Sequence, residues 1–195
     1  MQNGKYIDGG SNDIVAHGGC TIQNFNVDGT GGSLESNGGW LCQENFGLRN
    51  TGADITVTNC NSIGAISGQN AGGIFGQSAN QDSSGKIAVA NCYFSGAISG
   101  SNAGGIFGWG ANNDSKPGSE IMVTNCYSSG AITGLYAGGI FARFANRDSE
   151  GTITVTNCYS TGDISDNATN AGGIFGSQAN YLGSGGTITV TNCYS

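Results

Sequence analysis

Five of the seven cysteines occupy the same position in a recurring motif that ends in Asn-Cys. They are separated by 32, 34, 32 and 35 residues, whereas zinc sites draw their ligands from closely spaced pairs. A relaxed disulfide brings two Cβ atoms to about 3.8 Å, closer than the roughly 4.8 Å between stacked strands. We therefore predict a buried column of reduced thiols that act as small hydrophobic side chains. Its members are Cys60, Cys92, Cys126, Cys158 and Cys193. Cys20 and Cys42 stand outside this column, and a bridge between them stays open.

Acidic residues recur in the motif Ala-Asn-x-Asp-Ser, which contains Asp82, Asp114 and Asp148. If these carboxylates stack along one edge, they are weak candidates for binding calcium, which takes oxygen ligands of this kind. The alternative interpretation is turn chemistry, because Asn and Asp side chains close loops by bonding to their own backbone. The motif lacks the dense acidic pattern of an EF-hand loop, which favours turns over a calcium site. We predict no other cofactor.

The sequence contains few groups of residues that could act together in catalysis. His17 is the only histidine, so a Ser-His or Cys-His nucleophile pair would have to include it. A lone acid in each loop does not supply the paired carboxylates of a glycosidase. Lyases and epimerases of β-helical fold cluster Asp, Lys and Arg on one strand face, where this sequence places Thr, Ala and Ser. We therefore predict no catalytic residues and no enzymatic activity.

The elements that position these residues follow from two repeated motifs. The first, Ile-x-Val-x-Asn-Cys, lies at residues 55–60, 87–92, 121–126, 153–158 and 188–193. The second, Ala-Gly-Gly-Ile-Phe-Gly or Ala, lies at residues 71–76, 103–108, 137–142 and 171–176. Both motifs are short, β-branched and bounded by glycine, which indicates strands, and no segment has the period of an amphipathic helix. The leucine frame and helical return of a leucine-rich repeat are missing.

The spacing predicts an all-β fold, a right-handed parallel β-solenoid (β-helix) that is roughly three-sided, with about 33 residues per coil. From each cysteine to the next glycine pair the distance stays at 12, 12, 12 and 14 residues, and length varies mainly after the glycine block. This predicts three short strands and one tolerant loop per coil. We predict an N-terminal cap or lead-in at 1–19 and one solenoid at 20–195. Its coils are a degenerate copy at 20–54, full copies at 55–86, 87–120, 121–152 and 153–187, and a partial copy at 188–195.

Alternation along each strand assigns side chains to the core or to the surface. Ile55, Val57, Cys60 and Ile66 are predicted to point inward, and the threonines between them outward. Asparagines at the first corner are predicted to bond to the turn backbone and to the asparagine of the next coil. They are Asn59, Asn91, Asn125, Asn157 and Asn192.

Two aromatic columns are predicted to face outward and are candidate interfaces. One is Phe75, Phe107, Phe141 and Phe175, extended by Leu41. The other is Tyr93, Tyr127, Tyr159 and Tyr194. For the phenylalanines a second interpretation stays open, in which the loops fold back over them. Aromatic rows also stack on sugars. The outward threonines resemble an ice-binding face, but Ala88, Ala90 and Met122 interrupt them.

Composition limits the partners. The net charge is −7 with six basic residues spread thinly, so the basic stripe that nucleic acids require is missing. No run approaches the roughly 18 apolar residues of a membrane span, and the N-terminus lacks the pattern of a signal peptide. Glycine is abundant, at 37 residues, without the triplet period of collagen.

The pattern Val-Thr-Asn-Cys-Tyr-Ser-x-Gly-x-Ile, followed by Ala-Gly-Gly-Ile-Phe-Gly, resembles the GLUG-type repeat over about residues 20–195. Ile and Phe stand here where that family usually has leucine and valine. The resemblance implies a surface or attachment module of bacteria or large DNA viruses and carries over no catalytic residues.

We expect a structural or adhesive module (fibre, spike or attachment protein) outside the cell, on the cell surface or on a virion. Its partners would be a protein, a glycan or copies of itself. The alternatives are a carbohydrate- or ice-binding solenoid and a non-catalytic part of a larger secreted enzyme. The final segment, Ile188–Ser195, begins a strand with no coil behind it, which leads us to expect head-to-tail assembly or a longer array.

Overall fold

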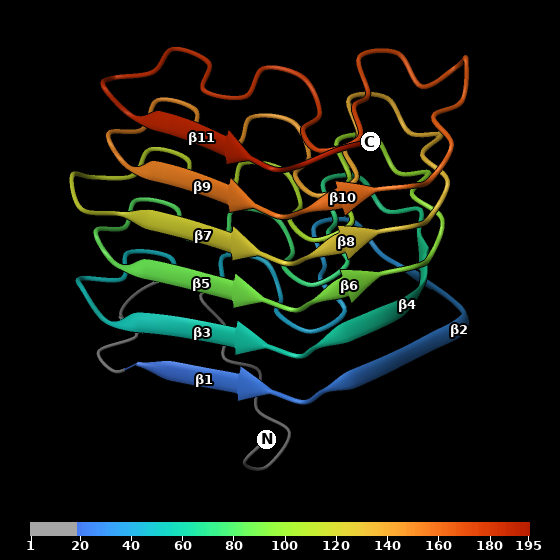
Figure 1. Ribbon diagram of the computed structural model, residues 1–195, viewed down its shortest axis with the longest axis horizontal. Coiled ribbons are helices and arrows are strands. Elements are labelled where there is room, and N and C mark those ends of the chain that lie inside the picture. Colours follow the sequence, from blue (N-terminus) through green and yellow to red (C-terminus); the bar gives the residue numbers. More distant parts are fainter. Residues whose placement is uncertain (1–18) are drawn as a thin grey trace.

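A computed structural model describes residues 19–195, which form a parallel β-solenoid without a helix (Figure 1). The first sheet contains β1 (Cys20–Gln23), β3 (Asp54–Thr58), β5 (Lys86–Ala90), β7 (Glu120–Thr124), β9 (Thr152–Thr156) and β11 (Thr187–Thr191). The second contains β2 (Asn26–Leu34), β4 (Asn61–Ile66), β6 (Tyr93–Phe94), β8 (Tyr127–Ser128) and β10 (Tyr159–Ser160). The predicted fold class is confirmed. His17 and most of the predicted cap at 1–19 lie outside the described residues.

The register of the first sheet shows directly that each coil repeats the one before it. Ile87 on β5 lies opposite both Ile55 on β3 and Ile121 on β7, and every neighbouring pair of strands is parallel. The same alignment continues through Ile153 to Ile188. Equivalent residues thus stack in columns along the solenoid axis, which is the arrangement that turns one short motif into a continuous core.

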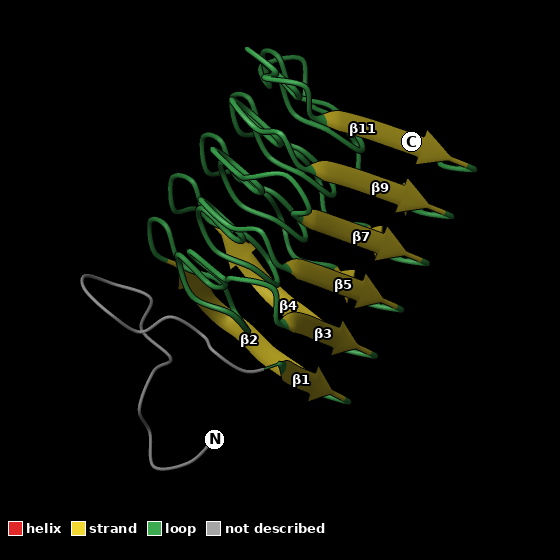
Figure 2. Ribbon diagram, turned by 90° about the vertical axis from the view of Figure 1, so that its left-hand side faces the viewer, coloured by secondary structure: helices red, strands yellow, loops and turns green. Residues whose placement is uncertain are grey.

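A third side closes each coil without forming regular strands. Isolated parallel bridges join the glycine blocks, first through the column of Gly72 and then through the column of Phe75. Figure 2 shows the strands of the first sheet at one side of the solenoid and a thick layer of loops at the other. The part of the chain that the structure describes contains no helix that is long and apolar enough to cross a membrane.

The core lies between the two sheets and this third side. Ile55, Val57, Cys60 and Ile66 are buried as predicted, with at most 2% of each exposed. Phe94 on β6 is also fully buried, in a column that holds serine in other coils. Burying an isoleucine or valine side chain contributes roughly 1.5–3 kcal/mol. Because these side chains are buried by stacking on the coils above and below, each coil gains most of its stability from contacts with its neighbours.

The glycine block is a bend, and the prediction of an alternating strand there was wrong. The amides of Ile74 and Phe75 both donate to the carbonyl of Ile106, at 3.1 and 2.8 Å, so two consecutive residues face the same way. At Gly72 the neighbouring backbone is so close that a Cβ atom would collide with the carbonyl oxygen of Phe75. Because glycine alone permits this approach, the chain turns sharply there and sends both large side chains inward.

Candidate functional site

The first asparagine column forms the predicted ladder at the exposed corner between the two sheets. Each side chain donates from Nδ2 to Oδ1 of the asparagine in the preceding coil, for example from Asn91 to Asn59 at 3.2 Å. The ladder runs from Asn24 through Asn59, Asn91, Asn125 and Asn157 to Asn192. From Asn59 onward its members have φ of 53–54°, a left-handed conformation that asparagine tolerates better than most residues.

The cysteine column is buried as predicted, with Cys60, Cys92, Cys126 and Cys158 at most 1% exposed and Cys193 partly exposed. Its sulfur atoms also take part in hydrogen bonds. The backbone N–H of Cys92 donates to Sγ of Cys126 at 3.4 Å, and among residues 19–195 it has no carbonyl acceptor. The thiol of Cys126 in turn donates to the carbonyl of Thr124 at 3.3 Å. Four sulfurs of the column therefore each satisfy the backbone amide of the cysteine in the preceding coil, which an aliphatic side chain could not do.

All seven cysteines are free thiols in the structure, including Cys20 and Cys42. Cys42 lies opposite Phe75 at the start of the phenylalanine column, and burial raises its pKa well above the ordinary thiol value. Within residues 19–195, no three His, Cys, Asp or Glu side chains are grouped to hold a metal ion.

A second asparagine ladder, which the sequence interpretation treated only as turn residues, lies buried four residues after the glycine block. Asn80 donates to Asn112 at 3.0 Å, Asn112 to Asn146 at 2.7 Å, and Asn146 to Asn180 at 3.0 Å. Asn80, Asn112 and Asn146 are fully buried. The first half of the predicted tolerant loop is therefore an ordered part of the repeat, and within this loop the length varies only after the asparagine. The fixed spacing from glycine block to asparagine was the signal that could have revealed it.

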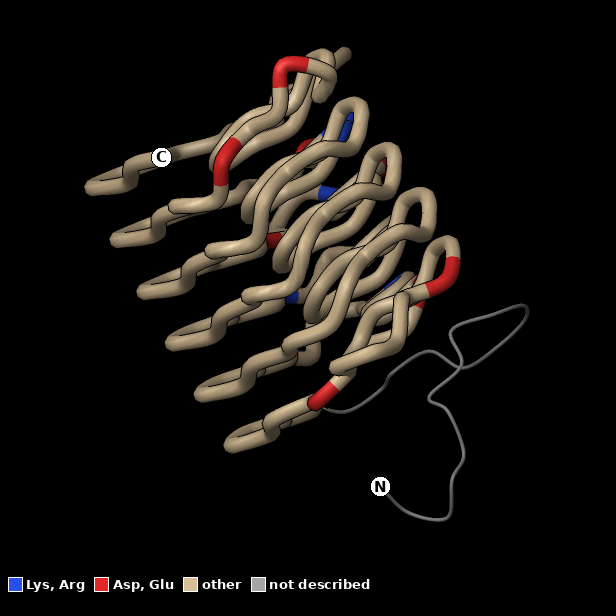
Figure 3. The backbone as a smooth tube through the Cα atoms, turned by 90° about the vertical axis from the view of Figure 1, so that its right-hand side faces the viewer, with Lys and Arg blue, Asp and Glu red and all other residues tan. Residues whose placement is uncertain are grey.

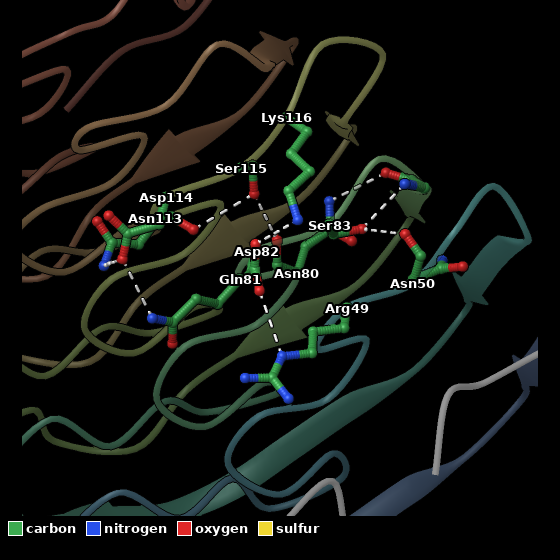
Figure 4. A network of polar contacts seen from close by, with 11 residues as sticks. Arg49, Asn50, Asn80, Gln81, Asp82, Ser83, Asn113, Asp114, Ser115 and Lys116 are labelled. Carbon is green, nitrogen blue, oxygen red and sulfur yellow. Dashed lines mark hydrogen bonds and ion pairs between the residues drawn. The ribbon is translucent and has the colours of Figure 1, made fainter. Parts of the chain in front are cut away.

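The acidic residues beside this ladder pair with other side chains and not with one another (Figure 4). Asp82 lies between two cations, at 2.7 Å from Lys116 and 3.2 Å from Arg49, which come from the coils on either side. The hydrogen bond from Lys116 is the main reason that the pKa of Asp82 falls below its usual value. Asp114 accepts hydrogen bonds from Gln81 and Asn113, and Asp148 pairs with Arg147. For Asp82 and Asp114 this geometry supports cross-linking of neighbouring loops better than calcium binding, whereas Asp148 is paired within its own loop.

The phenylalanine column is not an outer surface, which corrects the prediction that it is an interface. Phe75, Phe107 and Phe141 are fully buried and stack at ring-centroid distances of 4.7 and 4.7 Å, with Phe175 adding a partly buried ring at 4.9 Å. The bend at the glycine block is the physical reason, because it turns these rings inward. Leu41 does not extend the column, since the register places Cys42 in that position.

The tyrosine column does lie on the surface of the second sheet. Tyr93, Tyr127 and Tyr159 are partly exposed, and Tyr194 is 61% exposed. Their rings stack nearly parallel at 4.9, 4.9 and 5.0 Å, so neighbours cover the ring faces along the column. The side chain of Asn61 donates to the hydroxyl of Tyr93 below the first ring. The column therefore offers ring edges and phenol groups to a partner, and not the open ring faces on which sugars stack.

The outer face of the first sheet carries the threonine positions. Thr56 lies opposite Ala88, which lies opposite Met122, and threonine returns at Thr154. Met122 is 38% exposed and stands out from this face. The threonine rows are therefore regular at the two ends of the sheet and interrupted in its middle.

Charged residues are few in the strands and lie at strand starts, apart from Asp28 within β2. Figure 3 shows a largely uncharged tube in which the acidic and basic positions are scattered, mainly at bends and loops. One ion pair joins the starts of two strands, Lys86 on β5 and Glu120 on β7, at 3.0 Å. The surfaces that repeat most regularly are thus polar and uncharged.

The fold and its columns define the chain as a tandem-repeat parallel β-solenoid. Comparison with protein-family models, with curated proteins and with solved structures finds no match. The resemblance to GLUG-type repeats therefore stays an expectation that rests on the motifs themselves.

Proposed function

We propose that the chain is a non-catalytic structural or adhesive module, which displays its repeated outer faces to a protein or glycan partner outside the cell, on a cell surface or on a virion. The stacked tyrosine column, with identical rings every 4.9–5.0 Å, is the observation that supports this most. A row of identical groups at fixed spacing contacts an extended or repetitive partner many times at once, and many weak contacts add up to strong attachment. The asparagine ladders hold this row in place before binding, which lowers the entropy cost of association.

Adhesion assays on a panel of immobilised glycans and surface proteins test this proposal. A variant with Tyr93, Tyr127 and Tyr159 all replaced by serine removes the rings from the surface of the second sheet. Met122→Ser changes an exposed side chain on the outer face of the first sheet and serves as the control. We expect the serine triple variant to lose binding and Met122→Ser to keep it. Equal binding by both variants, or no binding by the unmodified chain, would contradict an adhesive role for the column.

Two alternative functions, carbohydrate binding and ice binding, fit the same surfaces less well. Carbohydrate binding by ring stacking needs open ring faces, which the tyrosine column lacks over most of its length. Ice binding needs an uninterrupted flat row, and Ala88 and Met122 break the threonine row in the middle of the sheet. Thermal hysteresis measurements distinguish this second alternative directly. A non-catalytic role within a larger secreted enzyme is compatible with the same faces.

Copies of the chain are a further candidate partner, because the asparagine ladder is directional. Within residues 19–195 it begins with Asn24, whose Oδ1 accepts from the next coil, and ends with Asn192, whose Nδ2 donates to the coil before. The Nδ2 group of Asn24 and the Oδ1 atom of Asn192 are therefore complementary. Docking of β11 on β1 would continue the ladder and, as a heterologous contact, would build filaments. Electron microscopy of the isolated chain at increasing concentration tests this assembly.

A further inference from the structure

The coil at 121–152 carries two aromatic residues and an arginine on the edge next to its glycine block. Tyr136 precedes the block, and Arg143 and Phe144 follow it. In the other coils the position of Tyr136 holds Asn70, Asn102 and Asn170. The position of Phe144 holds Ser78, Gly110 and Gln178. The positions of Arg143 and Phe144 vary from coil to coil, whereas the position of Tyr136 is otherwise always asparagine, so Tyr136 is the substitution that needs a separate explanation.

The replacement of asparagine by Tyr136 lowers the stability of the fold in two ways. Asn102 donates to Asn70 at 3.0 Å in a third asparagine ladder, but Tyr136 has no amide to continue it. As a result Oδ1 of Asn102 is buried without a hydrogen-bond partner. Tyr136 also has φ of 58°, a conformation that suits the asparagine of the other coils and strains an aromatic residue. Strain and orphaned polar atoms that packing does not explain are typical of binding sites.

These residues converge on one guanidinium group. Cζ of Arg143 lies 4.4 Å from the ring centroid of Tyr136 and 4.2 Å from that of Phe144. Its Nε and Nη2 groups both donate to Oε1 of Gln178, at 2.7 Å for Nε. Of the lysines and arginines in residues 19–195, Arg143 is the one without an ion pair to a carboxylate. It thus keeps an unneutralised positive charge and free N–H groups in a chain of net charge −7.

Aromatic rings extend the cluster along the solenoid axis into the coils on either side. The ring centroid of Phe144 is 5.9 Å from that of Trp109 and 5.9 Å from that of Tyr181. The planes meet at 90° and 46°, so these rings do not cover one another as the stacked tyrosines do. Tyr181 is 43% exposed, and Trp109 and Phe144 are partly exposed. Arg143 lies over the rings of Tyr136 and Phe144, and Cζ of Arg147 also lies 4.8 Å from the ring centroid of Phe144. The rings of Trp109 and Tyr181 are therefore the ones left to contact the apolar face of a ligand with a polar rim.

We propose that Arg143, Tyr136 and Phe144, with the flanking rings of Trp109 and Tyr181, bind a pyranose ring that carries one carboxylate. The guanidinium group binds the carboxylate through charge-assisted hydrogen bonds, and an aromatic ring contacts the C–H face of the sugar. The net negative charge of the chain favours a single carboxylate over a polyanion, which the surrounding acidic residues would repel. Such a sugar acid is either free or the terminal residue of a glycan. This site is separate from the tyrosine column, and its failure would leave the proposed adhesive function untouched.

Titrations of the whole chain followed by NMR test the proposal, with glucuronate as the probe and glucose as its uncharged counterpart. We expect glucuronate at millimolar concentration to shift the indole signal of Trp109 and glucose to bind at least about tenfold more weakly, a difference of about 1.4 kcal/mol. A terminal glucuronyl disaccharide that binds as well as the free acid would identify a glycan end as the ligand, and weaker binding would identify the free sugar acid. Equal binding of glucose and glucuronate, or no binding of either, would overturn the proposal.

Two variants separate binding from folding. Arg143→Gln removes the charge and should weaken glucuronate binding about tenfold, whereas Arg49→Gln removes a paired arginine elsewhere and should leave binding unchanged. Tyr136→Asn restores the ladder residue and should weaken binding while it raises the melting temperature, because Asn102 regains a donor. Loss of binding with a higher melting temperature cannot come from misfolding. Unchanged glucuronate binding in Arg143→Gln would refute the site.

Discussion

Asn112 donates a hydrogen bond from Nδ2 to Oδ1 of Asn146 at 2.7 Å, and both side chains are fully buried. The exposed asparagine ladder at the corner of the sheets makes the same type of bond, from Asn91 to Asn59 at 3.2 Å. The two ladders share their chemistry and their left-handed backbone, with φ of 58° at Asn112 and 54° at Asn91. They differ in solvent access and in the number of hydrogen bonds, because Asn112 also bonds to Ser119 and to the carbonyl of Thr152.

We expect Asn112→Ala to destabilise the fold by about 2–4 kcal/mol and Asn91→Ala by about 1 kcal/mol or less. Both substitutions impose the same backbone strain on alanine. Only the first leaves a buried acceptor unpaired, namely Oδ1 of Asn146, and it also removes the acceptor of the buried Ser119 hydroxyl. Urea denaturation of the two variants gives the comparison. Equal losses would mean that the inner ladder has access to water.

The sequence was sufficient to predict the solenoid because every coil repeats the same strand motif, and each copy reinforces the others. It was misleading at Phe75, where period-two alternation assumes an extended chain. The Gly72-Gly73 pair instead allows a bend that no alternation rule describes, and both Ile74 and Phe75 turn inward. Arg143 was missed for a different reason. Columns are found by what coils share, whereas Arg143 and Phe144 occupy positions whose residues differ from coil to coil.

The sulfur–amide bonds reverse the simplest expectation for the cysteine column. A buried hydroxyl usually costs more than a buried methyl group, so burial alone predicts that serine is worse than alanine at Cys126. Here Sγ of Cys126 is the acceptor for the buried N–H of Cys92 at 3.4 Å, and a serine oxygen can replace it. We expect Cys126→Ala to cost about 2–3 kcal/mol and Cys126→Ser about 1 kcal/mol less. Thermal unfolding of both variants measures the order, and a less stable serine variant would show that the amide bond contributes little.

Alkaline pH should weaken the fold through groups that ionise more easily in the unfolded chain. Burial raises the pKa of Cys42 well above the ordinary 9.0, and partial burial beside Tyr93 and Tyr159 raises the pKa of Tyr127 above 10.0. Because the folded chain holds these protons more tightly, their contribution is complete below about pH 9 and is lost as the pH rises above it. Urea midpoints measured at about pH 7 and pH 10 should therefore fall with pH. Cys42→Ala should show a smaller fall, and an unchanged pH dependence in that variant would exclude Cys42 as a cause.

Deletion of one whole coil tests whether the columns alone hold the array together. Removal of residues 87–120 joins Lys86 to Ile121 and places β3 against β7, with Ile55 opposite Ile121 and the asparagine and cysteine columns still in register. Since coils contact only their neighbours, we expect a folded, shorter solenoid with a lower melting temperature. Removal of residues 87–102 deletes about half a coil and destroys the register, so this control should lose the β-sheet signal of the downstream coils. Circular dichroism and thermal unfolding distinguish the two. An unfolded whole-coil deletion, or equal tolerance of both deletions, would show that the coils are not interchangeable units.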